Sequence, residues 1–316
     1  MIGLPVLYGL AGLLFAIFAI GSATDRTNPK RWGNALFWGL FSVSFLAGSW
    51  LPDVINGLLL VAMALVAGFN LMGKGEPAPQ TDRAERAARW GNRLFVPALI
   101  PPIVTLLGTL TLKGVEVGGV PLVDPKQVTL VSLGAGIVLA TAVALVMFRA
   151  SPAVAVREGR RLMDSVSWAG LLPQALAALG AVFAAARVGD VIGGLATDWL
   201  PIDGPLAAVI AYTVGMALFT AIMGNAFAAF PVMTAAIALP LIVGKFGGDP
   251  AIVCAIGMLS GFCGTLLTPM AANFNIVPAA LLELPDRNGV IKAQAPTALL
   301  LLLANTVLMY ALAYRF

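Results

Sequence analysis

The chain has 316 residues, of which 59% are hydrophobic and 11% charged, with a mean hydropathy of +0.93 and a net charge of +4. Soluble domains have about 45–50% apolar and about 25% charged residues, so this composition predicts an all-α polytopic protein embedded in a lipid bilayer. The basic residues lie in short loops between apolar runs, which argues against nucleic acid as a partner, and the absence of histidine excludes histidine-based catalysis and the usual zinc sites.

Apolar segments follow one another along the whole chain. At about 20 residues per span, the length accommodates about ten transmembrane segments, some of them broken helices or re-entrant hairpins. We expect two transmembrane halves, 1–187 and 188–316, with both broken regions in the second. The segments are predicted at 3–22, 34–51, 54–72, 94–112, 127–149, 166–187, 205–223, 231–244, 250–264, 274–284 and 296–314.

Lys and Arg are distributed unequally between alternate loops. One set of loops holds twelve and the other holds three, these sets being 24–34, 73–93 and 149–164 against 51–56, 113–126 and 187–204. Cytoplasmic loops are enriched in Lys and Arg, so the first set is predicted to be cytoplasmic and the N-terminus to lie outside.

A short motif occurs twice in the first half. Residues 31–37 read Arg-Trp-Gly-Asn-Ala-Leu-Phe and residues 89–95 read Arg-Trp-Gly-Asn-Arg-Leu-Phe. Each copy ends a basic loop and enters an apolar segment, as an interfacial anchor would. An old internal duplication is the other interpretation, since transporter folds often contain repeats.

The carboxylates are explained by their positions at the ends of apolar segments. Asp53, Asp124 and Asp249 are expected to cap or start helices, Asp164 to lie in the first turn of a span, and Glu283 to mark an exit from the membrane. No acidic residue has to lie at mid-membrane, so the sequence gives little support to a proton relay.

The fourth segment contains Pro97, Pro101 and Pro102, followed by two threonines and a glycine. We expect these prolines to break the helix. The segment is then either a kinked structural helix or the counterpart, in the first half, of the broken regions described next.

The first uncharged run, 204–244, is interrupted by Gly224-Asn225, with Thr220 before it and Pro231 after it. A tight turn between two packed spans is one explanation, because Gly-Asn is ordinary turn chemistry. The other is an unwound backbone that binds a solute, which in lipid is tolerated only where protein or a water-filled cavity satisfies it.

The second uncharged run, 250–282, contains a cluster of Gly, Thr, Pro and Asn between Ser260 and Pro278. A kink at Pro269 combined with small residues for close helix packing would explain it. Because both runs are rich in neutral oxygen and amide ligands, we favour a binding role in which both take part.

The predicted site has no catalytic residue and no metal ligand. Its residues are Thr220, Gly224, Asn225, Gly264, Thr265, Thr268, Asn273 and Asn275. Half-helix N-termini suit a carboxylate, whereas unwound carbonyls with Thr and Asn oxygens suit Na⁺ as a coupling ion. No nucleophile, acid–base pair or phosphate-binding motif is evident, so we expect neither an enzyme nor a cofactor.

Three stretches, 91–101, 224–235 and 261–284, resemble an uncharacterised family of bacterial inner-membrane proteins described as predicted permeases. The latter two read Gly-Asn-Ala-Phe-Ala-Ala-Phe-Pro-Val-Met-Thr-Ala and, at the start, Gly-Phe-Cys-Gly-Thr-Leu-Leu-Thr-Pro-Met-Ala-Ala-Asn-Phe-Asn. The resemblance covers essentially the whole chain. That family is similar to the ion transporter superfamily, whose members move small carboxylates and other anions by an elevator-type motion, often with sodium.

The resemblance also implies a partner and a substrate. The family is typically encoded beside a second, smaller membrane-protein family and pyrrolidone-carboxylate peptidase, which releases 5-oxoproline (pyroglutamate). Superfamily members carry paired hairpins in both halves, whereas the first half here has only the proline-rich segment. Either the site is asymmetric or a partner subunit supplies the missing half.

We therefore expect a multi-pass bacterial inner-membrane protein with a periplasmic N-terminus that forms a subunit of a secondary transporter. The expected substrate is a small organic anion, for which the resemblance implies 5-oxoproline, and access would alternate by an elevator-type motion. The alternatives are a non-transporting membrane scaffold or regulatory partner of a neighbouring permease, and a passive channel.

Overall fold

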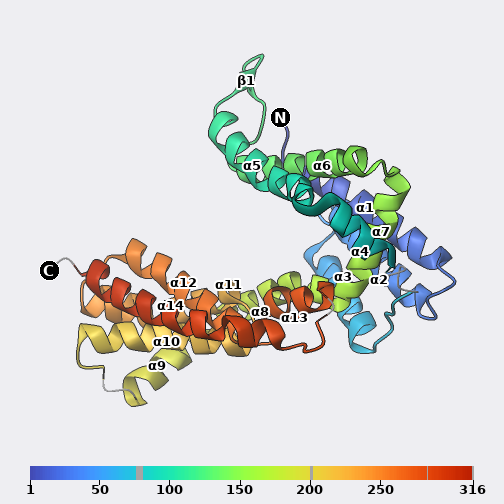
Figure 1. The fold of residues 1–316 in the computed structure, drawn as a ribbon. Coiled ribbons are helices and arrows are strands. Elements are labelled where there is room, and N and C mark those ends of the chain that lie inside the picture. Colours follow the sequence, from blue (N-terminus) through green and yellow to red (C-terminus); the bar gives the residue numbers. More distant parts are fainter. Residues whose placement is uncertain (76–80, 200–201, 283, 315–316) are drawn as a thin grey trace. The chain divides into compact units, whose positions relative to one another are not determined.

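The computed structural model describes residues 1–75, 81–199, 202–282 and 284–314 (Figure 1). It consists of two compact units, 1–167 and 168–316, each of which is described by itself. The transmembrane halves expected at 1–187 and 188–316 stay a prediction.

Unit 1 is helical apart from one short hairpin in which β1 and β2 pair antiparallel. Helix α1 packs against α2, and α5 packs against α6. The elements are α1 (Leu4–Thr24), α2 (Arg31–Ala47), α3 (Asp53–Gly68), α4 (Thr81–Trp90), η1 (Gly91–Leu94), α5 (Phe95–Thr111), β1 (Glu116–Val117), β2 (Val120–Pro121), α6 (Val128–Phe148) and α7 (Pro152–Val166).

Unit 2 is built around three long helices, α10, α12 and α14, which pack against one another. The main chain joins α12 and α14 at one end, where Asp249 N donates to Ala313 O at 2.8 Å. The elements are η2 (Ser167–Leu171), which crosses the boundary between the units, then α8 (Leu172–Ala185), α9 (Val188–Trp199), α10 (Pro205–Met223), α11 (Ala226–Met233), the π-helix η3 (Thr234–Lys245), α12 (Pro250–Leu266), α13 (Ala272–Leu281) and α14 (Gly289–Ala313).

Several helices are long and apolar enough to cross a membrane, which indicates a multi-pass membrane protein. Within the described ranges there are six such helices, or up to seven if the bent pair Pro152–Val166 and Ala169–Phe183 forms one span. Three further apolar helices, Asp53–Gly68, Pro250–Leu266 and Ala272–Leu281, are shorter than 18 residues. The six helices are Leu4–Thr24, Ala87–Thr111, Val128–Phe148, Pro205–Met223, Ala226–Lys245 and Gly289–Ala313.

An aromatic cluster forms the core of the α1–α2 pair. The rings of Phe15 and Trp38 are stacked with centroids 5.6 Å apart, and Phe37 packs edge-on against Trp38. Phe37 and Trp38 are fully buried. Offset and edge-to-face pairs of this kind add specific geometry to the apolar burial, so they fix how α1 and α2 pack.

The predicted position of Asp164 is wrong. It lies in the last turn of α7 instead of opening the next span, and it is buried, with its Oδ1 accepting a hydrogen bond from Trp38 Nε1 at 2.8 Å. The expectation fails because residues 149–164 were read as a basic loop, whereas Pro152–Val166 forms an amphipathic helix whose apolar side packs on the protein. Unit 1 therefore contains a buried carboxyl that the residue pattern did not indicate.

Of the two interpretations of the proline-rich fourth segment, the structure agrees with a structural helix and not with a broken region. Helix α5 runs without interruption from Phe95 to Thr111 and contains Pro101 and Pro102. Proline removes a main-chain donor from a helix, so Pro101 and Pro102 leave the carbonyls of Pro97 and Ala98 without their usual donors. One turn later, Thr105 Oγ1 donates to Pro101 O at 2.7 Å. Proline is tolerated within transmembrane helices where neighbouring groups or small local adjustments satisfy the freed carbonyls.

Among the other carboxylates, Asp249 is a helix cap as predicted, since its Oδ1 accepts from Ala251 N at 2.8 Å. Asp53 occupies the first turn of α3. Asp124 instead forms a local turn by accepting from Lys126 N, and α6 begins only at Val128. Glu283 lies outside the described residues.

Candidate functional site

The first predicted interruption is present in unit 2. Helix α10 ends at Gly224, which has a left-handed φ of +75° and donates its N–H to Thr220 O at 2.7 Å. Glycine is the usual residue for this conformation at a helix end. Asn225 then starts α11, because its Oδ1 accepts from Phe227 N at 2.8 Å. The side-chain oxygen of Asn225 is thus used as a helix cap, and the dipeptide joins two helical segments, Pro205–Met223 and Ala226–Lys245, that are each long and apolar enough to cross a membrane.

The second predicted interruption separates α12 from α13, and Asn275 bridges it. The side chain of Asn275 is fully buried, and its Nδ2 donates to the carbonyl oxygens of Thr265 at 2.8 Å and Thr268 at 2.6 Å. These carbonyls belong to the end of α12 and to the unwound residues after it. Asn275 therefore satisfies main-chain acceptors that would otherwise be buried without a donor.

Gln294 on α14 completes this network, although no motif in the sequence pointed to it. Its Nε2 donates to Asn275 Oδ1 at 2.5 Å, so both ends of the Asn275 amide are occupied. The last segment was predicted to begin at residue 296. Helix α14 begins instead at Gly289 and contains Pro296. Because proline is tolerated within membrane helices, the predicted helix could have been extended back through residues 289–295, which would have placed Gln294 on it.

The two interruptions lie against each other within unit 2. A Cβ atom at Gly224 would lie 2.6 Å from the carbonyl oxygen of Met270, which belongs to the second interruption. Nearby, a Cβ atom at Gly264 would overlap the carbonyl oxygen of Ala217 on α10. Glycine is required at both positions because the two backbones approach too closely for a side chain.

Thr220 lies beside this contact with its hydroxyl fully buried. Its Oγ1 has no hydrogen-bond partner in the described part of the chain. A Cβ atom at Gly261 would lie 3.3 Å from that oxygen and 3.1 Å from the Cβ of Ala226, the first residue of α11. A buried, unpaired hydroxyl costs free energy, so this position calls for an explanation.

The remaining predicted residues differ in their surroundings. Thr265 is buried and its Oγ1 donates to Phe262 O at 2.6 Å. Thr268 is buried and its Oγ1 accepts from Met270 N at 3.2 Å. Asn273, in contrast, is exposed on α13. The structure thus brings seven of the eight predicted residues into the neighbourhood of the two interruptions as buried or partly buried groups and leaves Asn273 at the surface.

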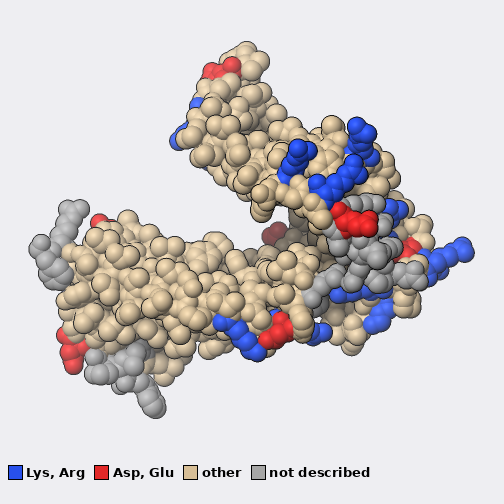
Figure 2. Space-filling view, in the orientation of Figure 1, with Lys and Arg blue, Asp and Glu red and all other residues tan. Residues whose placement is uncertain are grey.

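The electrostatics of this region come from helix ends and neutral groups. The N-termini of α11 and α13 and the C-termini of α10 and α12 all lie at the interruptions, and α13 has no side-chain cap at its N-terminus. The visible surface over α10, α12 and α14 is almost entirely uncharged (Figure 2). No three His, Cys, Asp or Glu side chains come together within the described ranges, so neutral oxygens and amides are the groups available for a ligand.

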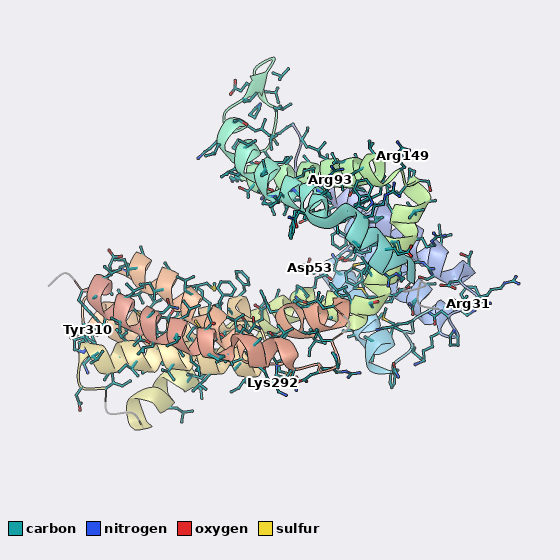
Figure 3. The ribbon with its side chains drawn as sticks, in the orientation of Figure 1. Arg31, Asp53, Arg93, Arg149, Lys292 and Tyr310 are labelled. Carbon is teal, nitrogen blue, oxygen red and sulfur yellow. The ribbon has the colours of Figure 1, made fainter. Side chains whose placement is uncertain are left out.

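The nearest charged pair flanks the region at the start of α14. Lys292, labelled in Figure 3 at the end of α14 opposite Tyr310, donates its Nζ to Asp286 Oδ2 at 2.7 Å. This hydrogen bond holds the pKa of the Asp286 carboxyl below its ordinary value. Lys292 precedes Gln294 by two residues, so the charge lies close to the network in sequence but is already paired.

This arrangement defines the class of protein: a multi-pass, all-helical membrane protein in which two helix interruptions meet around buried neutral polar side chains. The chain belongs to the family described as "Protein of unknown function (DUF979)", which it matches over residues 5–314. No curated protein and no solved structure matches it.

Proposed function

We propose that this protein is a subunit of a secondary transporter for a small organic anion. The observation that carries the proposal is the meeting of the two interruptions around Thr220, whose buried hydroxyl has no partner. An apolar side chain at position 220 would make the folded protein more stable, because a buried hydroxyl without a hydrogen bond is unfavourable. A solute that hydrogen-bonds to Thr220 during transport gives the hydroxyl a function.

The helix ends favour an anion as that solute. N-termini of helices carry partial positive charge and offer main-chain N–H donors, and those of α11 and α13 adjoin the site. Because the α13 N-terminus has no side-chain cap, its first amides are suited to a carboxylate. A cationic substrate would call for a buried acid, and the predicted site contains none.

The substrate, coupling ion and partner follow from chemistry and from the resemblance stated above. A small carboxylate with a lactam, such as 5-oxoproline, presents an anionic end and groups that Asn and Thr side chains recognise. Na⁺ is the candidate coupling ion, since carbonyl and hydroxyl oxygens suit it. In this proposal the protein lies in the bacterial inner membrane with a periplasmic N-terminus and about ten membrane segments, some of them broken helices. It works together with a second membrane subunit, and access to the site alternates by an elevator-type motion.

The alternative is a non-transporting scaffold for a neighbouring permease. The close packing of the two interruptions favours it, because Thr220 and Asn275 are fully buried and Gly224 touches the main chain of the second interruption. A passive channel is a third reading. It predicts a flux that does not saturate with substrate concentration.

The test is uptake of labelled small carboxylates, including 5-oxoproline, into proteoliposomes. The protein is measured with and without its partner and with and without a sodium gradient. Transport by this subunit predicts that Asn225→Ala and Asn273→Ala abolish uptake at unchanged membrane abundance. Asn225→Ala also removes a helix cap, whereas the side chain of Asn273 is exposed, so loss of uptake in Asn273→Ala is the result less open to explanation by lost stability. Normal uptake by both variants would refute the site, and uptake by the partner alone would favour the scaffold.

A further inference from the structure

Asp164 is a buried carboxyl in unit 1 that the proposed substrate site does not use. It lies in the last turn of α7 with 6% of its surface exposed. Its Oδ1 accepts a hydrogen bond at 2.8 Å from the indole Nε1 of Trp38, which is fully buried. Asn34, one turn earlier on α2, uses its side-chain amide to hydrogen-bond the main chain of Gly73. Both groups come from α2 and both are neutral.

The cationic side chains near Asp164 are engaged elsewhere. Arg160, one turn earlier on α7, donates from Nη2 to Asp25 Oδ2 at 2.8 Å and from Nη1 to Gly21 O at 3.1 Å. Arg161 pairs with Glu158 at 2.8 Å. Within the described ranges, no Lys or Arg lies at ion-pair distance from Asp164.

The helices packed against α7 add no counter-ion. Neither α1 nor α6 contains a charged residue between its ends, and the charged residue of α2, Arg31, is at the first position of that helix. At the helix ends, Asp25 is already paired with Arg160, and Arg149 is exposed. A buried carboxylate without a counter-ion is strongly disfavoured, whereas the same group carrying a proton is neutral.

We infer that Asp164 is a site of reversible proton binding that acts on the segment joining the two units. Asp164 takes up one proton to become a neutral acid and releases it to become a carboxylate, with no other bond formed or broken. As a carboxylate it makes a charge-assisted hydrogen bond with the Trp38 indole, and as an acid it makes a weaker one. Proton binding therefore loosens the attachment of the α7 end to α2.

The position of Asp164 in the chain connects this change to unit 2. Helix α7 ends at Val166 and unit 1 ends at Ser167, so Asp164 is four residues before Trp168, the first residue of the next unit. The strength of the Asp164–Trp38 bond sets how firmly this end of unit 1 is held. The coupling to solute movement rests on the proposed transport function, whereas proton binding itself does not.

Infrared spectroscopy of the purified protein in lipid tests proton binding directly, as pH is changed. We expect a carbonyl band of a protonated carboxylic acid that titrates in the wild type, is lost in Asp164→Asn and persists in Asp53→Asn, whose carboxyl is exposed. Trp38→Phe removes the indole donor to the carboxylate, so the titration should move to higher pH. Identical pH-dependent spectra of the wild type and Asp164→Asn would overturn the inference. A band that responds to Na⁺ at constant pH would overturn it as well.

Uptake in proteoliposomes tests the coupling separately, with the partner subunit present and labelled 5-oxoproline as the probe. An imposed pH gradient should change the rate of wild-type and Asp53→Asn uptake several-fold and should have no effect on Asp164→Asn. An equal response of Asp164→Asn would overturn the coupling. A carboxyl band that titrates in a protein showing no uptake of any carboxylate would uphold the proton site and contradict the proposed transport function.

Discussion

Thr220 is the residue on which the proposed site depends most, and it allows stability and function to be separated. Threonine and valine have nearly the same shape, so Thr220→Val removes a hydroxyl that has no partner in the described structure. Removing an unsatisfied buried hydroxyl should raise the free energy of unfolding by about 1–3 kcal/mol, while uptake is lost. Thermal unfolding in detergent and uptake at equal membrane abundance measure the two effects.

Thr213 on the same helix provides the matched control. Its Oγ1 donates to Val209 O at 3.0 Å and shares a hydrogen bond with Thr306 Oγ1 at 2.8 Å. Thr213→Val should therefore lower the free energy of unfolding by about 1 kcal/mol and leave uptake in place. Wild-type uptake by Thr220→Val would remove Thr220 from the binding site.

Gly224 is the second residue whose replacement has a definite outcome. Alanine at this position would have to adopt the left-handed conformation, which costs about 1–2 kcal/mol. Its Cβ would also collide with the carbonyl of Met270. We expect Gly224→Ala to lower the thermal stability clearly. Gly57→Ala, in the interior of α3 with open space around it, should be neutral or up to about 1 kcal/mol more stable. Equal stability of the two variants would contradict the close contact between the interruptions.

At the scale of elements, the two copies of the repeated motif have different environments. Asn34 is fully buried and exchanges two hydrogen bonds with the main chain of Gly73, at 2.9 and 2.8 Å. Asn92, at the equivalent position, is exposed in η1. We expect Asn34→Ala to cost about 2 kcal/mol, at about 1 kcal/mol per hydrogen bond, and Asn92→Ala to cost almost nothing. Unfolding curves of both variants check this, and a comparable loss in Asn92→Ala would argue for equivalent copies.

The ion pair between the end of α1 and α7 gives a prediction about pH. Burial raises the pKa of the Asp25 carboxyl, but hydrogen bonds from Thr27 and Arg160 outweigh it and hold that pKa below its ordinary value. A lowered pKa in the folded state means that the pair stabilises the protein above pH 3.8, the ordinary value, and that this contribution is lost as pH falls further. The stability difference between the wild type and Asp25→Asn should therefore be constant near neutral pH and shrink below about pH 4. A difference that changes between pH 6 and pH 8 would contradict this, and thermal melts across the pH range measure it.

The sequence predicted the interruptions better than it predicted what surrounds them. Gly224-Asn225 indicated a helix end and a new start, because these residue types have strong local preferences. The contact between Gly224 and Met270 depends on how α10 and α12 pack, which local preferences do not determine. Two helices continue through proline where the predicted segments were broken or shorter: α5 contains Pro101 and Pro102, and α14 contains Pro296. In each case tertiary packing overrides the tendency of proline to end a helix.

At the scale of the whole molecule, the orientation in the membrane is open to a direct test. The distribution of Lys and Arg predicts that the loop at 113–126 is outside and the loop at 149–164 is cytoplasmic. Both Cys254 and Cys263 are free thiols and can be replaced by serine. In that background, Glu116→Cys should react with a membrane-impermeant maleimide in intact cells, and Ser151→Cys only after lysis. The reverse pattern would invert the predicted topology.

The close contact of α10 and α12 limits how this protein can move. Three glycines of α12, Gly257, Gly261 and Gly264, face Tyr212, Met216 and Ala217 of α10, with almost nothing compressible in between. Backbones that interlock in this way neither slide along each other nor rotate independently. We therefore expect α10 and α12 to move together as one rigid body. A conformational change that admits a solute would then have to occur at the interruptions that end these helices, 224–225 and 267–271. A compound that rigidifies these two segments should block the conformational change without binding elsewhere on the protein.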